Sequence, residues 1–366
     1  MLNKEIIIFI PSIEDGGVEK NLFYIAKHFS NNLKKVYLIT SGKKYKGKLK
    51  KTELVTPFIN VENFTSRNIK YLFCLIKLFF FLLCTNKEKI IFSFQANIYA
   101  ILIAKLFNIK IIVRANSSPL GWSNNKLKFL IFKKIISLAN GIIVNSEDFK
   151  KIFDKKFQLS SKCIFNPLDK KNILKMSQEK VPNIFSVNRK TKLINVGRFV
   201  DQKDQITILK SIKYIKDKFK IDSFEVVIIG KGCLKNKLKN FIDKNDLQNE
   251  ITLLDYKKNP YPYIKQADIF LLSSKYEGLP NVLLEAAAMK KFIISSNCST
   301  GPREILSDGK FGNLFKVGDY KKLSTLLMES QKQNNNKKIK LCYEGLKRYD
   351  FDKNLNNYLE YINSFC

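Results

Sequence analysis

The stretch that decides the fold reads LLSSKYEGLPNVLLEAAAM and covers residues 271–289. Its first apolar residues predict a buried strand that ends near Ser273, and the strong helix formers of residues 281–289 predict a helix. Gly278 suits the loop between them, and Pro280 suits the first helical position. The order strand, loop, helix is typical of one βα unit in a parallel sheet.

Two acidic residues flank this loop and helix, Glu277 in the loop and Glu285 in the helix. Ligands of open α/β sheets bind beyond the carboxyl ends of the strands, where both residues fall. Each carboxylate can accept two hydroxyl hydrogen bonds, as the diols of a sugar or a ribose would offer. Taken singly, a solvated loop residue and a surface helix residue explain the two positions equally well.

The same alternation of short apolar runs and longer helical patterns continues along the whole chain, which favours parallel-sheet units. At 366 residues the chain exceeds the size at which one core stops growing. Residues 170–189 are polar, poorly periodic and contain Pro182, so they are the predicted linker between two domains. The predicted strands are 6–10, 36–40, 90–94, 110–113, 141–145 and 163–165, then 193–196, 225–229, 251–254, 269–273 and 292–296.

Three further segments follow predicted strands. Gly16 and Gly17 precede a helix, where a glycine pair lets the backbone approach a ligand, although a plain tight turn fits as well. Arg198 and Lys203, five residues apart, can place two cations around one diphosphate, but in so basic a chain chance explains them equally. The segment 230–232 has two glycines and is by itself only a turn signal.

Composition narrows the classes of function. The chain has 65 basic and 32 acidic residues, a formal charge of +33 that favours an anionic partner: nucleic acid, anionic lipid or phosphorylated substrates. The other explanation of the high positive charge is compositional drift, with lysine abundant along the whole chain. The seven cysteines never form CxxC, which argues against a disulfide framework or a zinc site and favours a reducing compartment. The single histidine, His28, lies in a helical pattern, so chemistry based on histidine is not expected.

No signal peptide is expected at the amino terminus, because the apolar run 6–10 is followed at once by Pro11. The most apolar stretch, Tyr71 to Cys84, contains Lys77 and is shorter than the roughly 20 residues of a spanning helix. It predicts either a helix buried against a sheet, which is favoured, or a helix resting on a membrane surface. These features predict a cytoplasmic protein.

Taken together, the motifs resemble the retaining enzymes of glycosyltransferase family 4, which have the GT-B architecture of two Rossmann-like, doubly wound parallel-sheet domains facing each other across a cleft. The resemblance spans nearly the whole chain, and it rests on the order and spacing of five markers. They are Gly16-Gly17, Phe165-Asn166-Pro167, Gly197-Arg198 with Lys203, Gly230–Gly232, and Glu277 with Glu285, between which seven residues lie.

The resemblance implies roles for individual residues. Arg198 and Lys203 would hold the donor diphosphate, and Glu277 would bind the donor sugar; these three are the expected catalytic residues. Glu285 would bind the ribose. The remaining expected donor-binding residues are Gly16, Gly17, Gly230, Tyr256, Gly278, Leu279, Pro280, Asn281 and Val282.

Two positions depart from the family pattern. Arg114 and Asn116 stand where many relatives carry a histidine near the reacting carbon, and they are expected on the acceptor side. Asp255 stands where a glycine is common, beside the expected base site of Leu254–Tyr256. The run 299–306, with Gly301-Pro302-Arg303, is similar to that of relatives that use N-acetylhexosamine donors.

The resemblance also implies a division of the chain. Residues 1–170 would form an acceptor-side domain, completed by a helix at about 349–366, and residues 171–348 would bind the nucleotide sugar. The only DxD triplet, Asp350 to Asp352, interrupts the helical pattern 338–366 and is interpreted as a helix break, so neither a metal site nor a cofactor is expected.

The expected function is retaining, metal-independent transfer of a hexose or N-acetylhexosamine from a nucleotide-diphosphate donor, with UDP favoured. The expected acceptor is a lipid-linked glycan or polysaccharide at an anionic membrane surface, with the enzyme peripheral at the inner membrane face, and no nucleic acid partner is expected. Alternatives are a non-catalytic protein that binds polyanions or nucleic acid, and a related enzyme that uses a soluble acceptor or acts as an epimerase.

Overall fold

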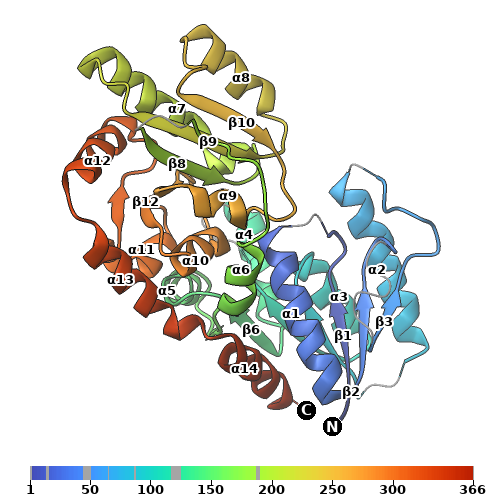
Figure 1. Cartoon of the computed structure of the whole chain (residues 1–366). Helices are drawn as coiled ribbons and strands as arrows, with labels where there is room; N and C mark the ends of the chain where they lie inside the picture. The colour runs from blue at the N-terminus through green and yellow to red at the C-terminus, as the bar shows by residue number, and fades with distance from the viewer. Residues whose placement is uncertain are drawn as a thin grey trace. The chain divides into compact units, whose positions relative to one another are not determined.

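The computed structural model describes residues 2–13, 16–43, 51–64, 66–85, 88–116, 125–186 and 190–365. The chain folds into two compact units (Figure 1). Unit 1 comprises Met1–Pro167 and Phe351–Cys366, and unit 2 comprises Leu168–Asp350. The sequence placed these boundaries at 170/171 and 348/349.

Unit 1 is built on seven parallel strands in the order β3-β2-β1-β4-β5-β6-β7. The chain order reverses between β1 and β4, as in doubly wound sheets. The strands are β1 (Leu2–Phe9), β2 (Leu33–Ile39), β3 (Thr52–Val55), β4 (Ile90–Ser93), β5 (Lys110–Arg114), β6 (Gly141–Val144) and β7 (Lys162–Cys163). The helices are α1 (Gly17–Asn32), α2 (Arg67–Leu83), α3 (Asn97–Leu106), α4 (Lys126–Ile136), α5 (Glu147–Phe157) and α14 (Phe351–Asn363).

Helices cover both faces of this sheet because alternate residues of each strand point to opposite sides. Ile7 and Phe9 of β1 share a core with the inner sides of α2, α3, α4 and α5. Ile6 and Ile8 share a second core with α1 and α14. The carboxyl-terminal helix therefore completes the unit that the amino terminus begins.

Unit 2 has six parallel strands in the order β10-β9-β8-β11-β12-β13, with the reversal between β8 and β11. The strands are β8 (Thr191–Val196), β9 (Phe224–Gly230), β10 (Ile251–Asp255), β11 (Ile269–Leu272), β12 (Phe292–Ser296) and β13 (Asn313–Phe315). The α-helices are α6 (Lys170–Met176), α7 (Gln205–Tyr214), α8 (Lys235–Lys244), α9 (Tyr261–Gln266), α10 (Asn281–Ala288), α11 (Pro302–Ile305), α12 (Tyr320–Lys332) and α13 (Asn336–Gly345). Short turns of other helix types are η2 (Asp201–Lys203), η3 (Ile215–Phe219), η4 (Ser307–Gly309) and η5 (Leu346–Tyr349).

Two doubly wound parallel-sheet units confirm the predicted fold class, and every predicted strand is present. The prediction missed β3 and β13, which are short edge strands. The expected helix break is also confirmed, because Asp350 has ψ 135° between η5 and α14.

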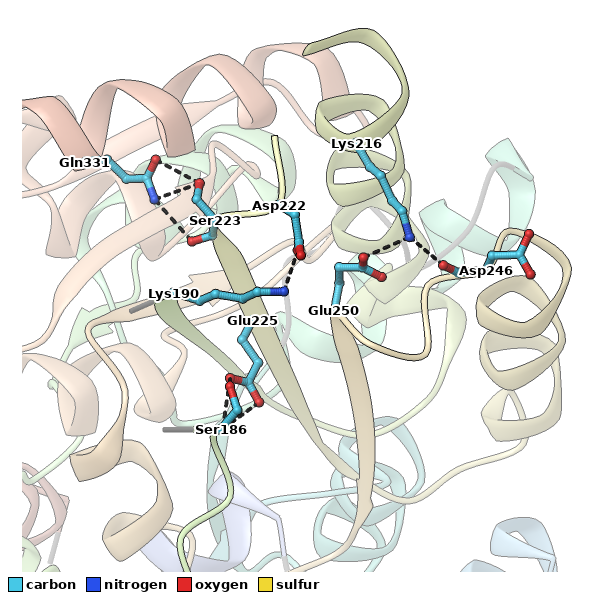
Figure 2. Close-up of polar contacts among 9 residues, drawn as sticks. All are labelled: Ser186, Lys190, Lys216, Asp222, Ser223, Glu225, Asp246, Glu250 and Gln331. Atoms are coloured by element: carbon cyan, nitrogen blue, oxygen red, sulfur yellow. Dashed lines mark hydrogen bonds and ion pairs between the residues drawn. The ribbon is translucent and has the colours of Figure 1, made fainter. Parts of the chain in front are cut away.

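The predicted linker is wrong, because the described part of residues 170–189 belongs to unit 2. The segment opens with α6, whose first turn is capped by Asp169, with Oδ1 accepting from Asn172 N at 3.0 Å. Ser186 then donates from its backbone N and its hydroxyl to the Glu225 carboxylate of β9, the hydroxyl at 2.6 Å (Figure 2). Lys190 Nζ donates to Asp222 Oδ1 at 2.5 Å, and Figure 2 marks this hydrogen bond with a dashed line.

The apolar stretch that begins at Tyr71 forms most of α2, and it is buried on one side only. Cys74, Leu78 and Leu82 are buried in the core, whereas Leu72 and Leu83 are more than half exposed. The interpretation as a buried helix therefore holds for the inner side alone. Among the described residues, none of the helices combines the length and apolar character that crossing a membrane requires.

Candidate functional site

The candidate site lies in unit 2, in the loops that follow β8, β11 and β12. These strands are neighbours in the sheet, and the chain order reverses at β8 and β11. The carboxyl ends of parallel strands at such a reversal are where open α/β sheets bind ligands. Most of the residues predicted for the donor fall in these loops and in the helix α10; the exceptions are Gly230 and Tyr256 at the ends of β9 and β10, and Gly16 and Gly17 in unit 1.

Lys203 and Glu277 are in direct contact. Lys203 ends η2, after β8, and Glu277 lies in the loop after β11; their Nζ and Oε1 atoms are 2.5 Å apart. The two side chains are only 16% and 9% exposed. The sequence places both residues at strand ends, but nothing in it predicts that they pair. A largely buried ion pair fixes the position of both groups.

Hydrogen bonds that backbone oxygens accept hold the two loops together around this pair. Lys275 N donates to Gln202 O at 2.8 Å, and Gln202 Nε2 donates to Tyr276 O at 2.9 Å. Ser273 Oγ donates to Lys203 O at 2.8 Å. Because these contacts run in both directions between the loops, Lys203 and Glu277 are presented on a rigid frame.

The loop after β12 supports the Glu277 loop. Thr300 Oγ1 donates to the backbone oxygen of Glu277. Gly301 has φ +84°, and a Cβ there would overlap Gly278 O, so only glycine fits this packing. Pro280 is the residue before α10, not its first helical residue, so the first N–H groups of the helix are those of Asn281 and Val282. Leu279 is buried beside them, and Val282 lies within the first turn of α10.

Glu285 lies on α10 and is 6% exposed. Tyr261, the first residue of α9, donates from its phenol oxygen to Glu285 Oε1 at 3.2 Å. The tyrosine is itself buried. Sequence reasoning missed Tyr261; the nearest signal was the tyrosine-rich run 261–263 in a loop after a strand.

Arg198 and Gly230 lie on the neighbouring strand ends. The Arg198 side chain is exposed, and its backbone oxygen accepts from Gln205 Nε2 at 2.9 Å. A Cβ at Gly230 would overlap Gly197 O, so glycine is required by the close approach of these two loops. Tyr256 follows β10, is 40% exposed, and lies under Lys231, whose Nζ is 4.5 Å from the ring centroid.

Four predicted site residues lie in unit 1. Gly16 precedes α1 and Gly17 begins it, and Gly16 N donates to Glu19 Oε2 at 3.0 Å. Arg114 ends β5 and is only 1% exposed. Its guanidinium donates to Tyr358 Oη at 3.0 Å, to Asn166 Oδ1 at 2.6 Å, and to Asn116 Oδ1.

The unit 2 groups form a coherent set for one kind of ligand. Arg198 and Lys203 supply cations, and the N-terminal amides of α10 supply hydrogen-bond donors; both suit a diphosphate. Glu277 and Glu285 supply buried carboxylate acceptors for hydroxyl groups. Such a set fits a nucleotide carrying a sugar.

Comparison with known proteins agrees with this chemistry. Residues 177–344, which lie within unit 2, match the family model "Glycosyl transferases group 1". Over 93% of this chain and 98% of the relative, the chain is 26% identical to the N-acetylgalactosamine-N,N'-diacetylbacillosaminyl-diphospho-undecaprenol 4-alpha-N-acetylgalactosaminyltransferase of Campylobacter jejuni. The solved structure of Anabaena HepE in complex with UDP superposes with a TM-score of 0.77 and 16% identity, covering 99% of this chain and all of that one.

The chain is a glycosyltransferase of the GT-B fold. An uncharacterized glycosyltransferase of Methanocaldococcus jannaschii is 34% identical over 56% of this chain, and the chain spans about half of that relative, 53%. An amylovoran biosynthesis glycosyltransferase of Erwinia amylovora is 25% identical over 83% of the chain. The alternative of a non-catalytic binding protein is therefore wrong.

Proposed function

We propose that this glycosyltransferase is a retaining, metal-independent enzyme of family 4 that moves a hexose or N-acetylhexosamine from a UDP-sugar to a lipid-linked glycan. The acceptor would be a sugar on a polyprenyl diphosphate, reached at the anionic inner face of a membrane. The Lys203–Glu277 contact carries the proposal, because it joins a cation for the diphosphate to an acceptor for sugar hydroxyls. The Campylobacter jejuni relative, whose name states a diphospho-undecaprenol acceptor, and the UDP-bound Anabaena structure support it.

Each residue has a role in this proposal. Arg198 and Lys203 bind the diphosphate with the amides of Asn281 and Val282, and Glu277 binds the donor sugar. Glu285 binds the ribose, and Tyr261 orients the Glu285 carboxylate through the 3.2 Å hydrogen bond. Charge-assisted hydrogen bonds of this kind contribute about 1.5–3 kcal/mol each, so three of them supply about 4.5–9 kcal/mol, a range that includes the about 8 kcal/mol of micromolar donor binding.

The chemical step breaks the bond between the anomeric carbon and the diphosphate oxygen. Negative charge develops on the departing UDP, and Lys203 and Arg198 neutralise it electrostatically, which is the task a metal ion would otherwise perform. The acceptor hydroxyl attacks from the face that UDP leaves, and its proton passes to the departing phosphate oxygen. Departure and attack on one face give retention, and no covalent nucleophile is needed.

On the unit 1 side, we assign Arg114 to positioning. Its buried guanidinium donates hydrogen bonds to Tyr358, Asn166 and Asn116. Arg114 would therefore hold Asn116 in place just after β5, and Asn116 would be the residue that contacts the acceptor. Gly16 and Gly17 at the start of α1 would approach the donor phosphates with backbone N–H groups.

Donor binding tests the first half of the proposal. A UDP-sugar at 100 times its dissociation constant stabilises the folded protein by about 2.7 kcal/mol, which should raise the melting temperature of the donor unit by roughly 5–10 °C. GDP- and ADP-sugars should give smaller shifts, and EDTA should leave the UDP-sugar shift unchanged. A shift that disappears in EDTA would refute metal independence, and equal shifts with all three donors would refute the preference for UDP.

Product analysis tests the second half. Transfer from an α-linked UDP-sugar to a sugar on a short polyprenyl diphosphate should give an α-linked product, identified by the anomeric coupling in its NMR spectrum. The same sugar without the lipid diphosphate should react far more slowly. A β-linked product would contradict retention, and equal rates with the two acceptors would favour a soluble acceptor.

A further inference from the structure

Exposed apolar side chains gather on one side of unit 1. Among the described residues, fourteen of the eighteen exposed large apolar side chains lie between Phe58 and Leu138, and ten of the fourteen are on α2, α3 or α4. The most exposed of the ten are Leu106 at 70%, Leu127 at 67% and Leu130 at 58%. We call the outer surface of these three helices the α2–α4 face. Apolar patches of this kind mark interaction sites on proteins that are otherwise water-soluble.

The α2–α4 face is continuous. The three helices cover the same side of the sheet, with α3 in contact with both α2 and α4. Phe79 of α2 meets Phe107, just after α3, with ring centroids 5.2 Å apart. The opposite side of the sheet is different, because no large apolar side chain in the described parts of α1 and α14 is exposed. The exposure is therefore a property of one side of unit 1.

Charge on the same helices is of one sign. They carry eight basic residues, three on α2, one on α3 and four on α4, and no aspartate or glutamate. Lys126 and Lys128 lie in the first turn of α4, where a positive charge opposes the helix dipole. By contrast, the first turn of α5 has Glu147 and Asp148. Lys126 and Lys128 therefore stand where their positive charge weakens the helix.

One basic side chain shows how charge and apolar surface combine. Lys77 of α2 lies with its Nζ 4.0 Å from the ring centroid of Phe58, which is 73% exposed, and Phe58 packs edge-on against Phe80. A cation beside exposed aromatic rings is the arrangement that suits a membrane interface, where the rings enter the headgroup region and the cation meets phosphate.

We infer that the α2–α4 face docks on an anionic phospholipid bilayer. The apolar side chains would enter the boundary between headgroups and acyl chains, and the lysines would meet lipid phosphates. A second copy of the chain fits less well, because pairing two such faces would bring two sets of eight positive charges together without acidic partners. The inference rests on the proposed function only in that a lipid-linked acceptor gives the docking a purpose.

Vesicle co-sedimentation of the full chain tests this inference. Wild type should bind vesicles of phosphatidylcholine with phosphatidylglycerol at least about ten-fold more tightly than phosphatidylcholine alone, and this preference should fall as salt rises. The variant Leu106→Ser/Leu127→Ser/Leu130→Ser should bind the anionic vesicles on the order of ten-fold more weakly. Its matched control is Leu174→Ser/Phe219→Ser in unit 2, two side chains 39% and 40% exposed, which should bind like wild type.

A second pair of variants isolates the charge. Lys126→Gln/Lys128→Gln/Lys134→Gln should lose about ten-fold in affinity for anionic vesicles and most of the salt dependence. The control Lys321→Gln/Lys322→Gln/Lys332→Gln on α12 removes the same charge and should change little. The inference is overturned if the α2–α4 variants bind like their controls, or if sedimentation shows a wild-type dimer that the serine variant dissociates and no vesicle binding.

The two proposals can fail separately. In the absence of vesicles, the serine variant should keep the UDP-sugar melting shift of wild type, because none of its three substitutions is at a residue assigned to the donor. If vesicle binding follows the pattern above but no UDP-sugar stabilises the protein, the docking inference stands and the proposed donor is wrong. If the donor shift is present and the vesicle results match the controls, only the docking inference fails.

Discussion

Replacing Lys203 by alanine is expected to lower the rate of sugar transfer by about 10²–10³-fold, the range found when one preorganised group that stabilises developing charge is removed. Lys203 Nζ is 2.5 Å from Glu277 Oε1, and both side chains are largely buried, so the variant loses a cation for the departing diphosphate and leaves the carboxylate unpaired. Steady-state kinetics should show the loss mainly in kcat. Circular dichroism and the melting temperature would establish that the variant remains folded.

A matched control is available on the same two loops. Lys275 pairs with Asp201 at 2.6 Å, but the two side chains are 40% and 81% exposed, and exposed pairs contribute at most about 1 kcal/mol. Lys275→Ala should therefore keep near wild-type transfer. Near wild-type transfer by a folded Lys203→Ala variant would remove the basis of the proposed site.

The double variant Lys203→Ala/Glu277→Ala separates catalysis from stability. Lys203→Ala alone leaves a buried unpaired carboxylate, which lowers stability by about 3–5 kcal/mol. The double variant removes that carboxylate and should regain part of the melting temperature while transfer stays lost. If transfer returned together with stability, Lys203 would act only by holding Glu277 in the fold.

The strands could be predicted because those of a parallel sheet are buried on both faces and form unbroken apolar runs. Ile90–Ser93 and Phe292–Ser296 are fully buried in this way. By contrast, β3 has the sequence TELV and lies at a sheet edge. Only one of its four residues is buried, so it does not form the apolar run by which the other strands were predicted. Helix α6 was mistaken for linker because its contacts are with distant residues, such as Asn259, whose Nδ2 donates to Met176 O at 2.9 Å. Sequence periodicity does not contain such contacts.

For the candidate site, too, the sequence predicts where the residues lie but not which of them are in contact. The sequence places Lys203 and Glu277 in loops that follow predicted strands and Glu285 in the next helix, which is the edge where the topology rule expects a ligand. It does not give the contacts, since Lys203 and Glu277 are 74 positions apart in the sequence and nothing in it records the distance between their side chains. Tyr261 was missed because a tyrosine in a Pro-rich turn has no pattern that predicts a carboxylate partner.

Arg114 was predicted as a site residue only from its position in the family pattern. Its hydrogen-bond partners in the structure explain its role better. It is joined to Tyr358 across 244 residues of sequence, because α14 returns to complete unit 1. Tyr358 Oη in turn donates to Ile164 O at 3.2 Å. Burial raises the pKa of the Tyr358 phenol, which therefore keeps its proton and can donate. One guanidinium thus links the end of β5, the segment around Asn166 and α14.

Arg114→Met is expected to lower the stability of unit 1 by about 3 kcal/mol, because each buried acceptor left without a donor costs about 1–3 kcal/mol. The methionine keeps much of the side-chain volume, so the cavity it leaves is small. Removing a buried charge that has no carboxylate partner among the described residues offsets part of the loss. The melting temperature should fall by roughly 6–12 °C, with faster hydrogen exchange in β5 and α14.

Tyr358→Phe is the milder comparison, because it removes one of the three contacts of Arg114 and should cost about 1 kcal/mol. Both variants should keep the UDP-sugar melting shift, since neither changes a residue assigned to the donor. An Arg114→Met variant as stable as wild type would show that the cluster does not hold α14. If the variant instead kept its stability and its slow exchange in α14 but lost transfer, Arg114 would act on the acceptor directly, and its assignment as a positioning residue would be wrong.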